Sequence, residues 1–337
     1  MKKNLVIPLL VGLLLNQSTA NAISENLLNS NTSFALSHWF ESHFTKQSFK
    51  TKEGVNLVYK KLTISNPKGA LFFIHGKSEF SYKYAELFFD ISNWGYDIYF
   101  MDQRGFGESD RLSDKTQKAY VDNFGKYVDD YDSFIKKELL NKKYTKKILI
   151  THSMGGAVAL GILERYPNLF NKVFMSAPMF KINTLSYSDS QVILFLTSLM
   201  LLGKAKESLP TIKEIPKIGG KEYQLTSSKI RFSSYLELIK RRPELMAGGA
   251  TIGWSFEALN YIWDLRRRSI NTLTTPILIL QAGRDVVVDF RGQDEICQNN
   301  PGYCKIIKFP ESYHELFFEK DEIRNQVIKI LYDYVES

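Results

Sequence analysis

Residues 147–156, Lys-Ile-Leu-Ile-Thr-His-Ser-Met-Gly-Gly, decide the fold of this chain. A short apolar strand runs into a turn of small residues, and residues 154–166 then show the apolar spacing of a helix. This order predicts a nucleophile elbow, which lifts the hydroxyl of Ser153 above the sheet and aims a helix N-terminus at developing negative charge. Thr151 stands where the strict Gly-x-Ser-x-Gly pattern has its first glycine, so the prediction depends on the strand–turn–helix context.

Short apolar segments and helical segments alternate on both sides of this turn. We expect strands at residues 55–62, 70–74, 96–101, 173–176, 276–280 and 305–309, and helices at residues 82–94, 127–140, 292–297 and 321–335. The expected strands rarely alternate with polar residues, which is typical of a mostly parallel central sheet with helices on both faces. The sequence therefore predicts an α/β fold, with residues 23–50 as a polar arm ahead of it.

The alternation stops between about residues 180 and 270, where helical stretches occur without clear core strands. We expect one α/β core in two parts, residues 23–179 and 271–337, interrupted by a mainly helical cap over residues 180–270. A chain of 337 residues with 44% hydrophobic and 24% charged residues can bury such a core, and its composition excludes a disordered or fibrous protein.

The first 22 residues differ from the rest of the chain. Lys2 and Lys3 precede an apolar run over residues 5–15, and a small-x-small site follows, ending at Ala22. This layout predicts a secretory signal peptide cleaved after Ala22, and therefore a periplasmic or secreted protein. A membrane anchor is the alternative, but a helix of eleven residues rises only about 17 Å against a hydrocarbon core of about 30 Å. Cleavage would lower the net charge from +8 to +6, because it removes two lysines and no acid.

Cys297 and Cys304 are the two cysteines of the chain, and a Pro-Gly turn lies between them. Export would place them in an oxidising compartment, so we expect a disulfide that closes this turn. Two free thiols are the alternative. No histidine lies near the pair in the sequence, which disfavours a metal site there.

A serine nucleophile needs a base, and the base needs an acid to orient it. His314 follows the last expected strand, and a loop at the carboxyl end of a strand can reach a nucleophile above the sheet. The other histidines lie before the core, beside the serine or at a strand end: His38, His43, His75 and His152. Asp285 follows the strand at 276–280 and is preferred as the acid over Asp289, which lies farther from the strand end. The order Ser153, Asp285, His314 is that of a hydrolase built on an α/β sheet.

Two backbone N–H groups are expected to form an oxyanion hole. Met154, directly after the nucleophile, supplies one, and Lys77 in the loop after the strand at 70–74 supplies the other. Gly76 allows the backbone to approach closely, and His75 and Gly76 are candidate substrate contacts. A simple turn is the alternative interpretation of these two residues.

The motifs together resemble those of the α/β-hydrolases of the bacterial lysophospholipase and monoacylglycerol lipase group, within the serine aminopeptidase-like set. The resemblance runs from about residue 50 to the C-terminus, through the segments Phe73–Gly76, Asp102–Ser109, His152–Gly156, Ser176–Phe180 and Tyr313–Leu316. It implies a serine ester hydrolase that acts on lysophospholipids through an acyl-enzyme, without metal or nucleotide cofactor. Residues 127–130 and 248–251 resemble lysophospholipases in particular.

The predicted cap carries both charge and an apolar segment. Residues 181–268 contain 14 basic and eight acidic residues. The run 192–202 is apolar except for Thr197 and Ser198, and we expect it to wall an acyl channel, with Leu194 and Leu201 as substrate contacts, or to touch a membrane surface. Helix packing on the core and a solvated basic face are the alternatives. The combination fits a lipid with one acyl chain and an anionic head.

Several other functions are open at this point. Monoacylglycerol lipase, short-chain carboxylesterase and peptidase activities all occur on such a core, because the pocket decides the substrate. A non-catalytic lipid-binding protein is an alternative of another class, although the intact Ser, Asp and His argue against it. The net charge could also suit nucleic acid, but no binding motif supports that partner.

Overall fold

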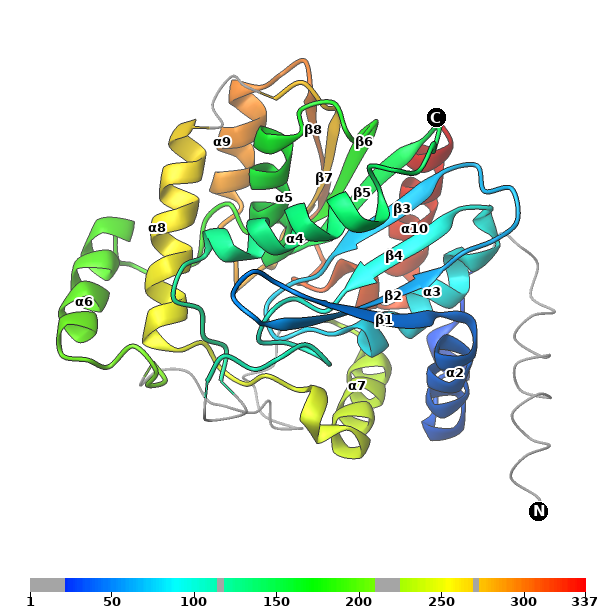
Figure 1. Cartoon of the computed structure of the whole chain (residues 1–337), viewed down its shortest axis with the longest axis horizontal. Helices are drawn as coiled ribbons and strands as arrows, with labels where there is room; N and C mark the ends of the chain where they lie inside the picture. Colours follow the sequence, from blue (N-terminus) through cyan, green and yellow to red (C-terminus); the bar gives the residue numbers. More distant parts are fainter. Residues whose placement is uncertain (1–21, 114–117, 210–224, 269–272) are drawn as a thin grey trace.

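The computed structural model describes residues 22–113, 118–209, 225–268 and 273–337. Its centre is an eight-stranded sheet with the order β1-β2-β4-β3-β5-β6-β7-β8 (Figure 1). The strands are β1 (Thr45–Lys50), β2 (Asn56–Leu62), β3 (Ala70–Ile74), β4 (Asp97–Met101), β5 (Lys147–His152), β6 (Lys172–Ser176), β7 (Ile277–Ala282) and β8 (Cys304–Phe309). Between the strands of this sheet only the pairings β1–β2 and β2–β4 are antiparallel, so the predicted mostly parallel sheet is confirmed.

Helices cover both faces of this sheet (Figure 1). One face packs against α4 (Gly125–Glu138), α5 (Met154–Arg165), α8 (Ile252–Arg268) and α9 (Arg291–Asn299). The other face packs against α2 (Ser30–His43), α3 (Ala85–Ile91) and α10 (Asp321–Glu336). Strand β3 serves both layers, because Phe72 and Ile74 enter one apolar cluster while Leu71 and Phe73 enter the other.

Residues 23–50 are not the polar arm that the sequence predicted. They form a short 3-10 turn (Glu25–Leu27), then α2 and β1. The buried residues of α2 recur every three or four positions: Thr32, Ala35, Leu36, Trp39 and Phe40. This is the spacing of a helix with one core-facing stripe, so the apolar stripe, rather than the polar average of the segment, decides its structure.

The helix expected at 82–94 is divided into three pieces. A 3-10 turn (Ser81–Tyr84) precedes α3, and a second one (Ser92–Trp94) follows it. Gly95 then turns the chain with φ 88°, a left-handed conformation that glycine adopts without steric cost.

Between β6 and β7 the described residues add no strand to the sheet, and the bounds of the predicted cap, residues 180–270, stay a prediction. Helix α6 (Asp189–Leu201) lies against α8 on one side of the molecule, whereas α7 (Lys229–Arg241) lies near α2 on another (Figure 1). The described helices of this segment therefore lie in two separate places on the molecule and do not form one compact layer. None of the helices in the described ranges is long and apolar enough to cross a membrane.

Candidate active site

The turn between β5 and α5 has the geometry of a nucleophile elbow. Ser153 has φ 51° and ψ −120°, a strained conformation for a non-glycine residue. The glycines after it are required by close packing, because a Cβ on Gly155 would lie 2.2 Å from the carbonyl oxygen of Ile74. A Cβ on Gly156 would lie 2.4 Å from the Cβ of Pro178. The small residues therefore let α5 start directly against the neighbouring strand ends.

Three predicted residues meet at this turn. The Nε2 atom of His314 lies 2.9 Å from the Ser153 hydroxyl, and its Nδ1 lies 2.7 Å from Oδ2 of Asp285. A carboxylate only accepts hydrogen bonds, so Nδ1 carries the proton and Nε2 is free to accept from the serine. Asp285 is itself held by the backbone N–H groups of Val287 and Val288, both bonded to its Oδ1.

Asp289, the competing acid, faces elsewhere. It pairs with Arg291 and with Lys181, and the Arg291 guanidinium holds the pKa of Asp289 down to about 2. The structure thus joins Asp285 rather than Asp289 to the histidine.

The environment of His314 favours a chargeable base. The side chain of His314 is only 5% exposed. Burial opposes its protonation, yet the adjacent Asp285 outweighs burial and raises the pKa of His314 above its ordinary value. A histidine held in this way can take the serine proton and keep the resulting charge beside a carboxylate.

The loop after β3 forms the opposite wall of the site. A Cβ on Gly76 would lie 3.1 Å from the Cβ of Ser153, so this loop passes directly beside the nucleophile. Neither Met154 nor Lys77 donates its backbone N–H to a protein group within the residues described, and both donors remain available for an oxyanion.

His75 supports this loop from behind. It is buried, its Nε2 accepts from the N–H of Gln103 at 2.9 Å, and its Nδ1 donates to the Gly76 carbonyl at 2.7 Å. Both ring nitrogens are therefore occupied. Of the two candidate substrate contacts in this loop, Gly76 lies beside the nucleophile and His75 shapes the backbone.

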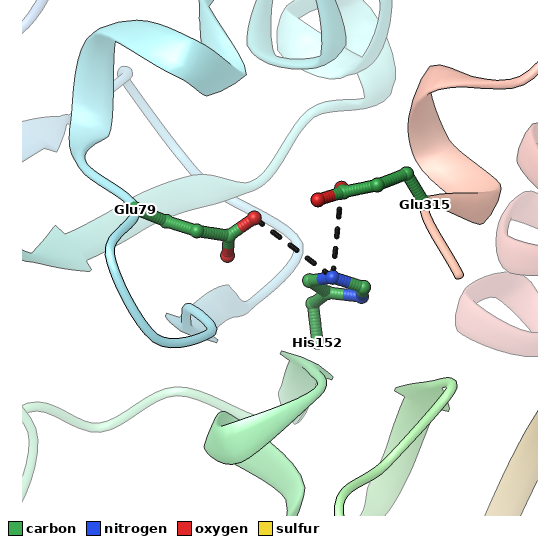
Figure 2. Close-up of side chains that lie close together, drawn as sticks. All are labelled: Glu79, His152 and Glu315. Atoms are coloured by element: carbon green, nitrogen blue, oxygen red, sulfur yellow. Dashed lines mark ion pairs between the residues drawn. The ribbon is translucent and has the colours of Figure 1, made fainter. Parts of the chain in front are cut away.

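A buried charged cluster under the site was not foreseen from the sequence. Figure 2 shows Glu79 and Glu315 on either side of His152, whose Nε2 lies 3.8 Å and 3.5 Å from their carboxylates. The ammonium of Lys83 pairs with both glutamates, at 2.7 Å from Glu315. Burial opposes ionisation of Glu79, but Lys83 holds the pKa of this carboxyl far below its usual range.

This cluster connects the two walls of the site. Glu79 accepts the backbone N–H of Gly76, and Glu315 is the neighbour of His314 in the chain. Two carboxylates and a histidine could in principle hold a cation, but the Lys83 ammonium already supplies the positive charge between them. In the sequence, Glu79 lies three residues after Gly76, and Glu315 directly follows His314. Only the fold brings Lys83 between these two glutamates.

The side chain of Lys77 is the other cation at the site. Its ammonium donates to the Ser78 hydroxyl at 3.0 Å and lies 5.6 Å from the centre of the Trp254 ring, on α8. Burial lowers the pKa of Lys77 to about 8. No carboxylate forms an ion pair with it in the part of the chain that the structure describes.

The two predicted acyl contacts lie on the outside of α6. Leu194 is 72% exposed and Leu201 is 85% exposed. Leu196 is the buried residue of this helix. Leu194 and Leu201 therefore line no enclosed channel among the described residues, and the structure does not bring them to Ser153.

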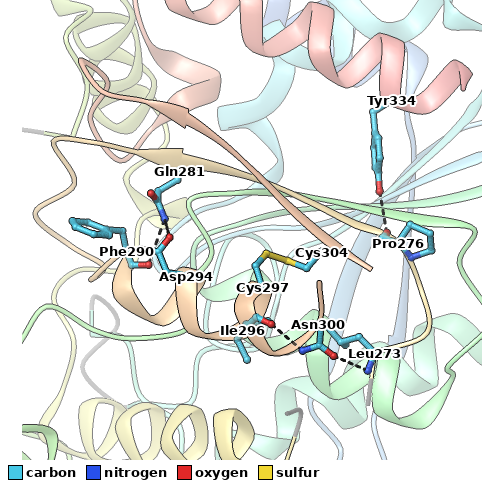
Figure 3. Close-up of a disulfide and its surroundings, with 10 residues drawn as sticks. All are labelled: Leu273, Pro276, Gln281, Phe290, Asp294, Ile296, Cys297, Asn300, Cys304 and Tyr334. Atoms are coloured by element: carbon cyan, nitrogen blue, oxygen red, sulfur yellow. Dashed lines mark hydrogen bonds between the residues drawn. A yellow bond between two sulfur atoms is a disulfide. The ribbon is translucent and has the colours of Figure 1, made fainter. Parts of the chain in front are cut away.

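The expected disulfide joins Cys297 to Cys304. It links the last turn of α9 to the start of β8, as Figure 3 shows. The adjacent Asn300 side chain donates to the Ile296 carbonyl at 2.9 Å and accepts from the N–H of Leu273 at 3.3 Å. The bond thus lies in a well-connected corner of the sheet rather than at the active site.

Comparisons with known proteins agree with this geometry. The chain matches the family described as Serine aminopeptidase, S33, over residues 65–321. It is 30% identical over 295 residues to a probable lysophospholipase L2 of Haemophilus influenzae, covering 86% of this chain and 91% of that one. It is 24% identical over 270 residues to the monoglyceride lipase of Mus musculus, covering 78% and 80%.

Solved structures show the same fold. A soluble variant of monoglyceride lipase from Saccharomyces cerevisiae superimposes with a TM-score of 0.68 at 19% identity, covering 86% of this chain and 94% of that one. A carboxyl esterase from Bacillus coagulans superimposes with a TM-score of 0.71 at 16% identity, covering 87% and 98%. The predicted α/β-hydrolase architecture is confirmed by these neighbours.

Proposed function

Because the chain belongs to the serine aminopeptidase S33 family and is a lipid ester hydrolase, we propose that it is an exported lysophospholipase that works through an acyl-enzyme. The observation that carries the proposal is the hydrogen-bonded series Ser153–His314–Asp285 beside two free backbone donors. Similarity over most of the chain to a protein named as a probable lysophospholipase supports the substrate class.

The reaction has two halves. The Ser153 oxygen attacks the acyl carbonyl carbon while Nε2 of His314 takes the hydroxyl proton, and the N–H groups of Met154 and Lys77 stabilise the oxyanion. The ester bond breaks, and the glycerophospho alkoxide leaves with the proton from His314. Water then attacks the acyl-enzyme, giving a proton to His314, which returns it to Ser153 as the fatty acid leaves. Asp285 stabilises the imidazolium in both halves.

Lys77 supports an anionic head group. Its backbone N–H is the second donor that we propose for the oxyanion, and its ammonium has a hydroxyl and a ring beside it but no carboxylate partner among described residues. Six bonds separate the ester carbonyl carbon from the phosphorus of a lysophospholipid, about 7 Å at ordinary bond lengths, which a lysine side chain can also span. We therefore assign the phosphate to the Lys77 ammonium, as a charge-assisted contact.

Export and membrane contact complete the proposal. The signal-peptide layout of residues 1–22 supports release into the periplasm or beyond, with cleavage after Ala22; residues 1–21 lie outside those described. The exposed apolar side chains of α6 and its flanks support peripheral contact with an anionic membrane: Leu185, Leu194, Phe195, Leu201 and Leu202. Such contact would bring the enzyme to its lipid substrate.

A substrate panel tests the assignment. Purified protein is assayed on lysophosphatidylcholine, monoacylglycerol, short p-nitrophenyl esters and aminoacyl amides, alongside Lys77→Met and Lys77→Arg. We expect lysophosphatidylcholine to give the highest kcat/KM. Lys77→Met should lower it by about tenfold or more, with Lys77→Arg restoring most of the loss. A preference for monoacylglycerol that Lys77→Met leaves intact would favour the monoacylglycerol lipase alternative instead.

A further inference from the structure

A buried cluster of charged side chains holds the residues that follow the predicted cleavage site. Ile23 is 2% exposed, and its backbone nitrogen lies 2.9 Å from Oδ1 of Asp90 on α3. Its carbonyl accepts from Arg231 at 3.0 Å. The Ser24 hydroxyl donates to Asp321 at 2.6 Å. Both ends of Ile23 are therefore fixed to the folded core.

The same side chains contact one another. The Asp90 carboxylate pairs with Arg324 at 2.6 Å. Arg231 pairs with Glu86 at 3.0 Å and with Asp321 at 2.8 Å. We call this set the amino-terminal cluster, and its members are Glu25, Glu86, Asp90, Arg231, Asp321 and Arg324. It joins α3, α7 and α10 around the start of the mature chain.

The amino-terminal cluster has fewer positive than negative side chains. Its four carboxylates face two guanidinium groups, counting only its own members. Burial, with Glu86 adding to it and Arg324 opposing it, raises the pKa of Asp90 to about 6. A buried carboxylate in this state is stabilised by a further cation within hydrogen-bond distance.

We propose that the α-ammonium of Ile23, freed by cleavage after Ala22, binds Asp90 as the missing cation of the amino-terminal cluster. Hydrolysis of the Ala22–Ile23 amide consumes one water, leaves a carboxylate on Ala22 and an amine on Ile23, and the amine takes a proton. One neutral N–H donor becomes a charged group with three donors, at the position where the nitrogen already lies 2.9 Å from Asp90. The inference rests on the cleavage proposed above and not on the substrate.

The burial of Ile23 fixes the order of events. A peptidase must bind an extended chain around the bond it cuts, and this bond adjoins a side chain that is 2% exposed in the folded protein. Cleavage therefore precedes docking of the terminus. The cluster then distinguishes a processed chain from an unprocessed one by one charge.

The experiment compares two starts in two backgrounds. One protein begins at Ile23, released from a fusion that leaves no extra residue, and the other retains Ala22 and so displaces its ammonium by about 3.8 Å. Each is made with Asp90 and with Asp90→Asn. In the Asp90 background we expect the extra alanine to lower Tm on the order of 5 °C. In the Asp90→Asn background the two starts should melt together.

Asp333→Asn is the matched control. It removes a carboxylate that pairs only with the exposed Lys329 in the described chain. The extra alanine should therefore lower the Tm of the Asp333→Asn protein by as much as it lowers that of the native sequence. A cost of equal size in the Asp90→Asn background would overturn the ion pair.

Chemical labelling decides the question if Asp90→Asn does not fold. We expect an amine-reactive reagent to label the Ile23 amine at least tenfold more slowly in the folded protein than after denaturation, and to label the Ala22 start readily. Equal labelling of the two folded forms would contradict the proposal. N-terminal sequencing of the exported protein tests the premise, since a terminus other than Ile23 overturns it. Lysophospholipid turnover, measured separately, tests the substrate.

Discussion

The carboxyl edge of the sheet and helix α6 are both built from apolar sequence, but the fold uses them differently. At the sheet edge the apolar strands are covered, and Ser153 and His314 are both buried. On α6 the apolar residues face outward, with Phe195 54% and Leu201 85% exposed. The sheet edge thus holds the catalytic side chains in place, whereas α6 presents an exposed apolar surface. Changes at the first should affect every substrate, and changes at the second should affect only aggregated lipid.

The largest effect expected is that of Ser153→Ala. Without the nucleophile, kcat should fall by about 10⁴-fold or more on both a soluble ester and lysophosphatidylcholine micelles, measured by fatty-acid release. Ser190→Ala, on α6, removes a hydroxyl of the same size and should leave both rates within twofold. Near-native turnover by Ser153→Ala with an unchanged Tm would remove the sheet edge as the site of chemistry.

Asp285→Asn and Asp289→Asn sharpen the same side of the comparison. An amide at 285 cannot fix the Nδ1–H tautomer of His314, so kcat should fall by about 10²- to 10⁴-fold. Asp289 pairs with Arg291 and Lys181 instead, so its variant should lose less than about threefold. A larger loss from Asp289→Asn would reassign the acid.

With a neutral substrate, the acid limb of the pH dependence reports on His314. It acts as a base only when neutral, and Asp285 raises its pKa above the ordinary 6.5, so kcat/KM should rise with pH through a midpoint above that value. Below the midpoint the rate should fall about tenfold per pH unit. The measurement uses a neutral soluble ester, and the midpoint should move down in Asp285→Asn. An acid limb that ignores this substitution would contradict the assignment.

Paired substitutions on α6 should give a smaller and selective effect. Leu194→Ser with Leu201→Ser removes two exposed apolar side chains, and turnover of lysophospholipid in anionic vesicles should fall by about three- to tenfold. Hydrolysis of a soluble short ester should stay unchanged, since neither residue lies at Ser153. An equal loss on both substrates would mean that α6 acts on the site and not on the lipid surface.

The smallest effect should follow neutralisation of the arginines that end α8. The sequence suggests a basic cap, yet Arg266 pairs with Asp189 and Glu295, and Arg268 pairs with Glu164 and Asp264. Arg266→Gln combined with Arg268→Gln should therefore change the turnover of lysophospholipid in anionic vesicles by less than twofold. Arg267 differs from these two, because it lies over the Trp263 ring. A tenfold loss from the substitutions at 266 and 268 would instead mean that the charge of the cap determines binding to the lipid surface.

The sequence predicts the part of the site that depends on chain order. Ser153, Asp285 and His314 each follow a parallel strand, and the carboxyl ends of such strands meet at one edge, so their proximity follows from the strand pattern. The Glu79–Lys83–Glu315 cluster does not follow from it, because its members pair through space and buried ion pairs leave no periodic signal. The apolar residues of α2 are spaced as in a helix, but the prediction of a polar arm rested on the average polarity of residues 23–50 and therefore missed this stripe.

The sheet order has a consequence for the protein at high concentration. Strands β1 and β8 lie at its two open edges, where unpaired backbone groups could recruit a strand from another molecule. Each carries two lysines, Lys46 and Lys50 on β1 and Lys305 and Lys308 on β8. A second molecule that tried to extend the sheet would bring like charges together at either end.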